Sequence, residues 1–376
     1  MFRKINSLIV IGFLLLTTQA FAQLSYSFST EQEYNDNPFR SQLATKTLIS
    51  SLDYSLEHNS DLLTIGYNGS YYNFEAVPVR NFYWHQLSAY KSFENSTVGI
   101  LAEQRLGKDI YTYFNYTNVT GYYTQQFRWD DFHIVVSPNA SLSKYPSISI
   151  LDNLKFSLNG TINRGFETGT TIILGGAFTY KKYLDPTQSG TYSYLDEVNQ
   201  IVSETYMDKN VSSITQMLSF LRVAQSITPT TGLAAQFTNR SILSGFGSFV
   251  KDLNMIYGDE SELFDDPVNY EGNNLSIELT QILFDDLSIK GSFFFNNKFY
   301  PSQGIYDEAY NYNTGIMRSD TQKILDFSLN KDIHLGSSED FSLSVGLKFQ
   351  LIKNQSNSSV FNYNSNSINL NVGFNF

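Results

Sequence analysis

The end of the chain alternates strictly between apolar and polar residues. The apolar positions are Ile368, Leu370, Val372, Phe374 and Phe376, and three asparagines and one glycine lie between them. Successive side chains of a β-strand point to opposite faces, so this period of two predicts a strand with one apolar and one polar face. A helix would instead repeat its apolar positions every three to four residues. The pattern therefore favours a sheet that faces two different environments.

The same alternation recurs along the chain and predicts about 16 strands. The expected spans are 24–34, 43–56, 62–73, 81–93, 97–105, 113–129, 132–144, 153–166, 170–183, 212–226, 232–242, 274–284, 287–300, 321–334, 341–353 and 360–376. Short and longer connections take turns between them, as in outer-membrane barrels with short periplasmic turns and long extracellular loops. We expect an all-β chain that forms a single transmembrane antiparallel β-barrel. A misread hairpin around 111–117 would reduce it to 14 strands.

The first 22 residues predict export. Arg3 and Lys4 precede a short apolar stretch, and Ala20 and Ala22 form an A-x-A cleavage site before Gln23. This is the pattern of a cleaved secretory signal peptide. We therefore expect a signal peptide at 1–22 and a β-barrel at 23–376, with no separate soluble domain. No later apolar run approaches the 18 residues of a transmembrane helix.

Composition supports a membrane barrel over a soluble β-sandwich or propeller. Charged residues are only 16% of the chain, against roughly 25% in typical soluble domains. Aromatic residues make up 15%, many of them near strand ends, as in interfacial girdles. The chain shows no fixed 40–50-residue repeat of the propeller kind. It also has no cysteine, which excludes disulfides and thiolate chemistry.

The signal peptide and the final strand, 368–376, together resemble Gram-negative outer-membrane β-barrel proteins. In that class a terminal aromatic residue within an alternating strand is recognised by the barrel-insertion machinery. The resemblance implies that Ile368, Leu370, Val372, Phe374 and Phe376 form this insertion signal. It also implies an outer-membrane location in contact with lipid. We expect no plug domain, unlike the TonB-dependent transporters, and no passenger domain, unlike the autotransporters.

If the apolar alternates face lipid, the charged residues between them line the lumen. The expected acids are Glu31, Glu33, Asp53, Glu103, Glu278, Asp326 and Asp332. The expected bases are Arg105, Arg128, Lys155, Lys181, Arg222, Arg240, Lys290, Lys298 and Lys348. A tight turn at 335–340 would place Asp326 opposite Lys348. Six further bases fall on outward positions near strand ends, where they can snorkel: Lys46, Arg164, Lys182, Lys323, Lys331 and Lys353.

Negative charge concentrates in two long loops. Without the signal peptide the chain has 23 basic and 36 acidic residues, a net charge of −13, which excludes nucleic acid as an expected partner. Loops 184–211 and 243–273 carry −10 of that charge. The acids Asp259, Glu260, Glu262, Asp265 and Asp266 are weak candidates for Ca²⁺, because they lack the spacing and glycine of an EF-hand. Apolar residues in loop 243–273 also suggest that it folds into the barrel mouth, with packing over the rim as the alternative.

The sequence favours a channel over an enzyme. None of the four histidines, at 58, 85, 133 and 334, lies in a G-x-S-x-G or H-E-x-x-H pattern. We therefore expect no catalytic residue and no cofactor, with a surface hydrolase as a remote alternative. The leading interpretation is a passive, porin-like channel for small hydrophilic solutes. The alternative is a plugged barrel whose acidic loops bind, assemble or export a polymer or secreted partner. A homo-oligomer is compatible with either interpretation.

Overall fold

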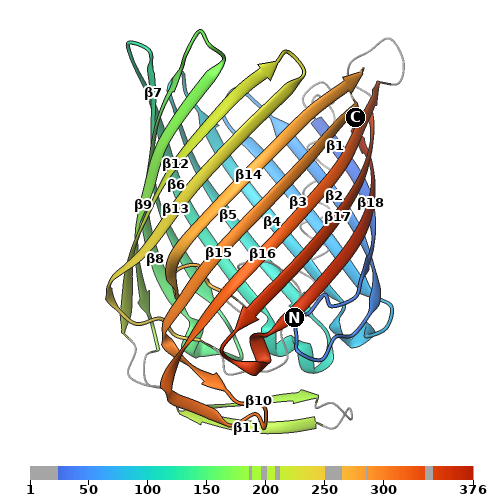
Figure 1. Cartoon of the computed structure of the whole chain (residues 1–376), viewed down its shortest axis with the longest axis vertical. Coiled ribbons are helices and arrows are strands. Elements are labelled where there is room, and N and C mark those ends of the chain that lie inside the picture. The colour runs from blue at the N-terminus through green and yellow to red at the C-terminus, as the bar shows by residue number, and fades with distance from the viewer. Residues whose placement is uncertain are drawn as a thin grey trace.

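The alternating segments form one closed barrel in the computed structural model. The structure describes residues 24–185, 189–195, 201–207, 212–249, 265–284, 287–334 and 342–375. The predicted signal peptide and the terminal Phe376 lie outside these residues. Every neighbouring pair of barrel strands is antiparallel, and β1 closes the sheet by pairing with β18. Figure 1 shows the strands tilted across the barrel wall, with the short turns and the C-terminus at its upper end.

The described part of the barrel contains 16 strands. They are β1 Leu24–Asn35, β2 Thr47–Asn59, β3 Thr64–Phe74, β4 Phe82–Ser92, β5 Ser96–Gly107, β6 Tyr116–Trp129, β7 Phe132–Lys144, β8 Asn153–Gly165, β9 Thr170–Tyr183, β12 Ser213–Thr228, β13 Thr231–Gly245, β14 Glu271–Phe284, β15 Leu287–Tyr306, β16 Tyr312–His334, β17 Ser342–Ser356 and β18 Tyr363–Asn375. Short 3₁₀ turns, η2 Pro78–Arg80, η3 Asp109–Phe114, η4 Ser149–Leu151 and η5 Ser359–Phe361, lie between strands at the long-loop end.

The predicted 16-stranded barrel is confirmed, although many strand boundaries differ by a few residues and some loops differ more. The predicted loop 184–211 contains a separate hairpin, β10 Ser189–Leu195 with β11 Ile201–Met207. Most of the predicted loop 301–320 continues β15 and β16, because the pairing resumes after an irregularity between Tyr300 and Gly304. The predicted strand at 113 begins only at Tyr116, since the residues before it form η3.

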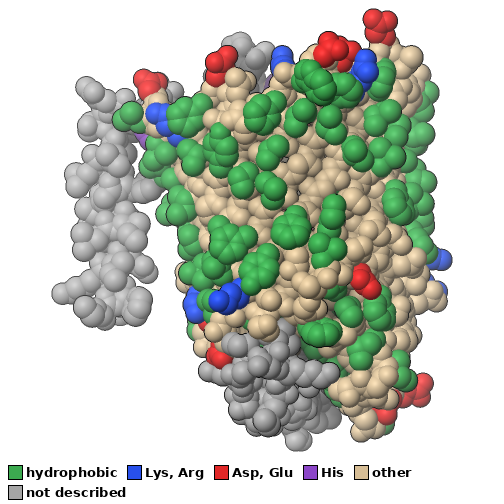
Figure 2. Space-filling model, turned by 90° about the vertical axis from the view of Figure 1, so that its left-hand side faces the viewer, with side chains coloured by type: hydrophobic (Ala, Val, Ile, Leu, Met, Phe, Trp, Pro, Cys, Tyr) green, Lys and Arg blue, Asp and Glu red, His purple; other side chains and the backbone are tan. Residues whose placement is uncertain are grey.

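The outer wall is apolar along its middle, as the alternation requires. On β14, for example, Leu275, Ile277 and Leu279 are exposed on the outside, while Glu278 between them points inward and lines a cavity. Figure 2 shows one outer face with hydrophobic side chains spread over its middle and most charged side chains near its two ends. This is the surface that a bilayer covers. In the part of the chain that the structure describes, no helix has the length and hydropathy of a membrane span.

Buried side chains gather at the long-loop end, where connecting segments pack inside the barrel. One cluster consists of Phe39, Ile49, Phe74, Phe82, Tyr306 and Val360. A second consists of Tyr111, Phe114, Tyr145, Ile148, Ile150 and Leu151, around η3 and η4. The first cluster combines residues of β2 to β4 with the segment between β1 and β2, the end of β15 and η5. The second combines η3 and η4 with the residues that precede η4. The opposite half of the wall, β12 to β18 with β1, borders open space.

Candidate functional site: the barrel lumen

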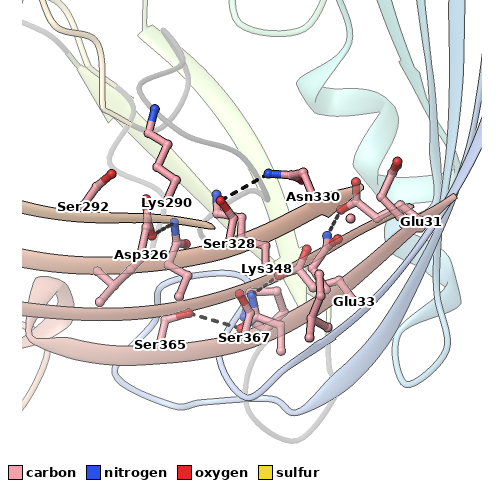
Figure 3. Close-up of a pocket in the computed structure, with 18 of the residues that line it drawn as sticks. Glu31, Glu33, Lys290, Ser292, Asp326, Ser328, Asn330, Lys348, Ser365 and Ser367 are labelled. Atoms are coloured by element: carbon pink, nitrogen blue, oxygen red, sulfur yellow. Dashed lines mark hydrogen bonds between the residues drawn. The ribbon is translucent and has the colours of Figure 1, made fainter. Parts of the chain in front are cut away.

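Two adjoining cavities occupy the lumen. Their volumes are about 710 and 630 Å³, and both are bordered by Arg40, Glu278, Asp326 and Lys348. Alternation places the polar side chains of β12 to β18 and β1 on this inner face. Figure 3 shows part of the first cavity, with Lys290, Asp326 and Lys348 on neighbouring strands and Glu31 and Glu33 at its far side. The shared residues make the two cavities parts of one polar interior space.

Many of the charged residues predicted for the lumen border this space. They are Glu31, Glu33, Arg222, Arg240, Glu278, Lys290, Lys298, Asp326 and Lys348. The other predicted residues, Asp53, Glu103, Arg105, Arg128, Lys155, Lys181 and Asp332, line neither cavity. Of these, Lys181 is buried beneath a loop, and the Arg105 guanidinium lies 4.1 Å from the centre of the Phe82 ring.

One acid between two bases forms a charged bridge in the wall. Glu278 on β14 binds Arg222 on β12 through one carboxylate oxygen at 3.2 Å and Lys290 on β15 through the other at 2.8 Å. All three side chains are partly exposed to the lumen, so solvent screens these pairs. The bridge fixes two cations on the wall with a single negative charge between them. This region of the lumen is therefore net positive.

The acids on the other side of the lumen accept hydrogen bonds from neutral side chains. Glu31 on β1 accepts a hydrogen bond from the Asn369 amide, and Glu33 accepts one from Asn35 at 2.6 Å. On β2, Asp53 accepts one from the Ser51 hydroxyl at 3.0 Å. The lumen wall is thus acidic along β1 and β2 and richer in bases along β12 to β15.

The expected pairing of Asp326 with Lys348 does not occur. Asp326 lies opposite Gln350, whose amide donates to the carboxylate at 2.8 Å, and Lys348 lies opposite Ser328. The prediction placed the centre of the hairpin one residue too early, and a shift of one residue in the turn moves every cross-strand partner by two. Both side chains still face the lumen and border both cavities.

Residues 265–270 lie against the inner wall and narrow the lumen. Asp266 forms an ion pair with Lys181 on β9 at 2.7 Å, and Asp265 forms one with Lys298 on β15. All four side chains are at least nine-tenths buried. The Tyr300 hydroxyl also donates to Asp265, at 2.5 Å. These partners come from lumen-facing positions, so this part of loop 243–273 folds inward.

Further hydrogen bonds hold the same segment. The Gln216 amide on β12 donates to the backbone carbonyls of Pro267 and Tyr270, both at 2.7 Å. The Asn269 amide donates to the carbonyl of Ser248 at 2.7 Å, within the same loop. Burial alone would raise the pKa of Asp265, but Lys298 and Arg318 outweigh it and hold that pKa below its ordinary value. Asp265 is therefore a fixed negative charge at neutral pH.

Two of the five candidate Ca²⁺ ligands are engaged in these contacts. Asp265 and Asp266 each bind a lysine, while Asp259, Glu260 and Glu262 lie outside the described residues. Among the residues that the structure describes, no group of three or more His, Cys, Asp or Glu side chains is placed to hold a metal ion.

Two arginines near the lumen were not singled out from the sequence. Arg40, between β1 and β2, borders both cavities, and Asn37 shapes its turn by accepting the Ser41 N–H at 3.1 Å. Arg318 on β16 is buried, pairs with Asp320 at 2.5 Å, and lies 3.4 Å from the centre of the Phe361 ring. Both fell in segments that were predicted to be loops. The alternation of Arg318, Asp320 and Gln322 was a signal that β16 extends this far.

Among the described residues, the contacts of His85 and His133 do not form a catalytic site. His85 lies on the outer face with Tyr83 and Leu87, and its Nδ1 is 2.8 Å from the Tyr67 hydroxyl. His133 Nε2 contacts the amide oxygen of Gln126 at 3.2 Å. Neither contact provides a nucleophile with an oriented base.

Comparison with solved structures identifies the architecture. OccAB1 of Acinetobacter baumannii matches at a TM-score of 0.54 and 9% identity, over 94% of this chain and 96% of that one. OprD of Pseudomonas aeruginosa matches at 0.51 and 9%, over 96% and 95%. CdiB of Acinetobacter baumannii matches at 0.52 and 10%, over 94% of this chain but 61% of its own. No family model matches the chain, and no curated protein matches it in sequence.

At identities this low, the likeness establishes the fold alone. The closed barrel, its apolar outer wall and these neighbours together make the chain an outer-membrane β-barrel protein of the Gram-negative type.

Proposed function

We propose that the protein is a passive channel that carries small hydrophilic solutes across the outer membrane. The observation that supports this most strongly is the pair of adjoining lumen cavities, which are bordered by six basic and five acidic side chains together with many Ser, Asn and Gln residues. A wall of this kind replaces part of a solute's hydration shell, whereas a structural core would be apolar. Sixteen strands also give a barrel wide enough for a water-filled lumen.

The distribution of charge supports selection among solutes. Acids lie along β1 and β2, while Arg222 and Lys290 flank Glu278 on the other side. Opposed charges across a narrow, water-filled space orient a polar solute by its dipole. The inward segment 265–270 reduces the width of the same space. The proposed channel therefore favours small solutes.

A planar-bilayer measurement on the refolded mature chain tests this proposal. We expect single insertions to give discrete current steps that scale with salt concentration. Absence of steps from protein that is folded and inserted would contradict the channel. A liposome-swelling assay with uncharged sugars of increasing size would then give the size limit.

A plugged barrel is the second candidate, and the buried clusters at the mouth favour it. Arg80 lies 3.7 Å from the centre of the Phe39 ring, so a cation and an aromatic ring also join the apolar packing there. In this case the loops would bind, assemble or export a polymer or secreted partner. Folded protein without current, which binds such a partner only when loops 184–211 and 243–273 are intact, would support this candidate.

A further inference from the structure

Two lysines face each other on the lipid-facing side of the barrel. Lys323 on β16 and Lys353 on β17 are direct cross-strand partners, and both are exposed. They occupy the outward positions of the alternation, together with Leu325 and Leu351. Like charges directly opposite each other destabilise a sheet. A negatively charged group bound between the two lysines would offset this repulsion.

The two lysines mark the edge of the apolar band at the long-loop end. On β16 the outward positions nearer the short turns include Leu325 and Phe327, and on β17 they include Leu347 and Phe349. Beyond the lysines the outward positions are polar, with Thr321 opposite Gln355. Lys331 lies eight residues from Lys323 along β16, which is about 26 Å of strand and about 20 Å of height at a tilt of about 40°, comparable with an apolar band of about 25 Å. Lys323 and Lys353 thus lie at headgroup depth.

Neither lysine has an acidic partner in the part of the chain that the structure describes. Among the described residues, no carboxylate lies within 4.0 Å of either ammonium group. Two other outward bases differ, since Arg164 binds Asp131 at 2.7 Å and Lys331 lies 6.0 Å from the centre of the Phe284 ring. Asp36, at the same edge, already accepts the backbone N–H and side-chain amide of Asn366, at 2.7 and 2.6 Å.

The lysines also share a concavity. A pocket of about 280 Å³ on the outer wall is bordered by Lys323, Lys353, Asn364 and Asn366, with Phe293, Leu325 and Leu351 as its apolar part. Asn364 lies directly opposite Lys353 on β18, so its amide adds a neutral donor beside the two cations. Snorkelling explains why a single lysine can lie at either position. It does not explain why two directly opposed lysines share one pocket that also has an apolar side.

We propose that Lys323, Lys353 and Asn364 bind the phosphate headgroup of a membrane lipid whose acyl chain lies over Phe293, Leu325 and Leu351. Lysine is a common phosphate ligand, and a dianionic phosphate accepts hydrogen bonds from both ammonium groups. The position at headgroup depth and the adjoining apolar surface distinguish a lipid from free phosphate. This site faces away from the lumen, so it is independent of the channel proposal.

Native mass spectrometry of the detergent-solubilised mature chain tests the site. The probes are bisphosphorylated lipid A, the same lipid after enzymatic removal of its phosphates, and inorganic phosphate. The double variant Lys323→Gln/Lys353→Gln should weaken the binding of bisphosphorylated lipid A by about tenfold or more. The matched control Lys182→Gln/Lys331→Gln removes two outward lysines that are not cross-strand partners, and it should bind as the unchanged protein does.

Three results would overturn the proposal. One is equal affinity of the double variant and the unchanged protein for phosphorylated lipid. A second is equal affinity of the unchanged protein for the phosphorylated and dephosphorylated lipid, which needs no variant to fold. The third is displacement of the lipid by millimolar inorganic phosphate, which would show a simple anion site. Loss of binding only in the double variant, with resistance to inorganic phosphate, supports a lipid site.

Discussion

Lys181 and Asp266 are 85 residues apart in the chain, yet they form an ion pair of 2.7 Å with side chains that are 1% and 4% exposed. Lys181 belongs to the barrel wall and Asp266 to the inward loop segment. The pair therefore fastens the loop to the wall where the lumen narrows. Removal of one partner from a buried pair leaves an unpaired charge, at a cost of about 3–5 kcal/mol.

We expect Lys181→Met to release segment 265–270 from the wall. Bilayer recordings should then show higher single-channel conductance and more current noise than the unchanged protein. The double variant Lys181→Met/Asp266→Asn buries no unpaired charge and should lie closer to the unchanged protein. Lys182→Met alters the neighbouring outward residue and serves as the control. Identical recordings for all three variants would show that this pair does not hold the loop.

Acid should loosen the same segment through Asp265. Because the pKa of Asp265 is held below 3.8 in the folded protein, its contribution is complete above about pH 4 and is lost as the pH falls through the folded pKa. Conductance should stay constant from pH 7 to about pH 4 and rise below that range. The variant Asp265→Asn should lack the part of this rise in conductance that comes from protonation of Asp265. A rise that begins near pH 6 would point to a different group.

Glu278 should control ion selectivity. Glu278→Gln removes the negative charge that pairs with both Arg222 and Lys290, so the lumen becomes more attractive to anions. We expect the reversal potential in a salt gradient to shift toward anions, with about a twofold or larger change in the permeability ratio. Asp131→Asn makes the same charge change in a short turn, where Asp131 binds Arg164 outside the lumen. An equal shift in both variants would indicate an effect of net charge alone.

The final aromatic residue should matter for assembly more than for the folded barrel. If Phe376 ends the signal that the insertion machinery recognises, Phe376→Ala should lower the amount of protein in the outer membrane. Refolding of the purified variant into detergent should be close to normal, because no insertion machinery takes part. Asn375→Ala, which leaves the apolar positions intact, is the control. A refolding defect as large as the defect in cells would argue for a structural role.

The alternation along the chain was enough to predict most of the fold. Period two at Ile368 to Phe374 and in 15 similar segments requires one face in lipid and one in a polar interior, and this local rule located the strands. It failed where strands ran beyond their apolar part. Arg318 and Asp320 extend β16 past the lipid, where neither face needs an apolar residue, so the sequence resembled a loop.

The partners of the charged side chains were decided only by the tertiary structure. Asp326 meets Gln350 because the turn fixes the register, and a shift of one residue in that turn is invisible in the alternation. Asp265 and Asp266 meet Lys298 and Lys181 only after the sheet has closed and the loop has folded inside it. The sequence by itself determined which face each strand residue occupies, because lipid and water act on every residue locally. Which charges meet across the lumen depends on closure, register and loop packing, which are properties of the whole barrel.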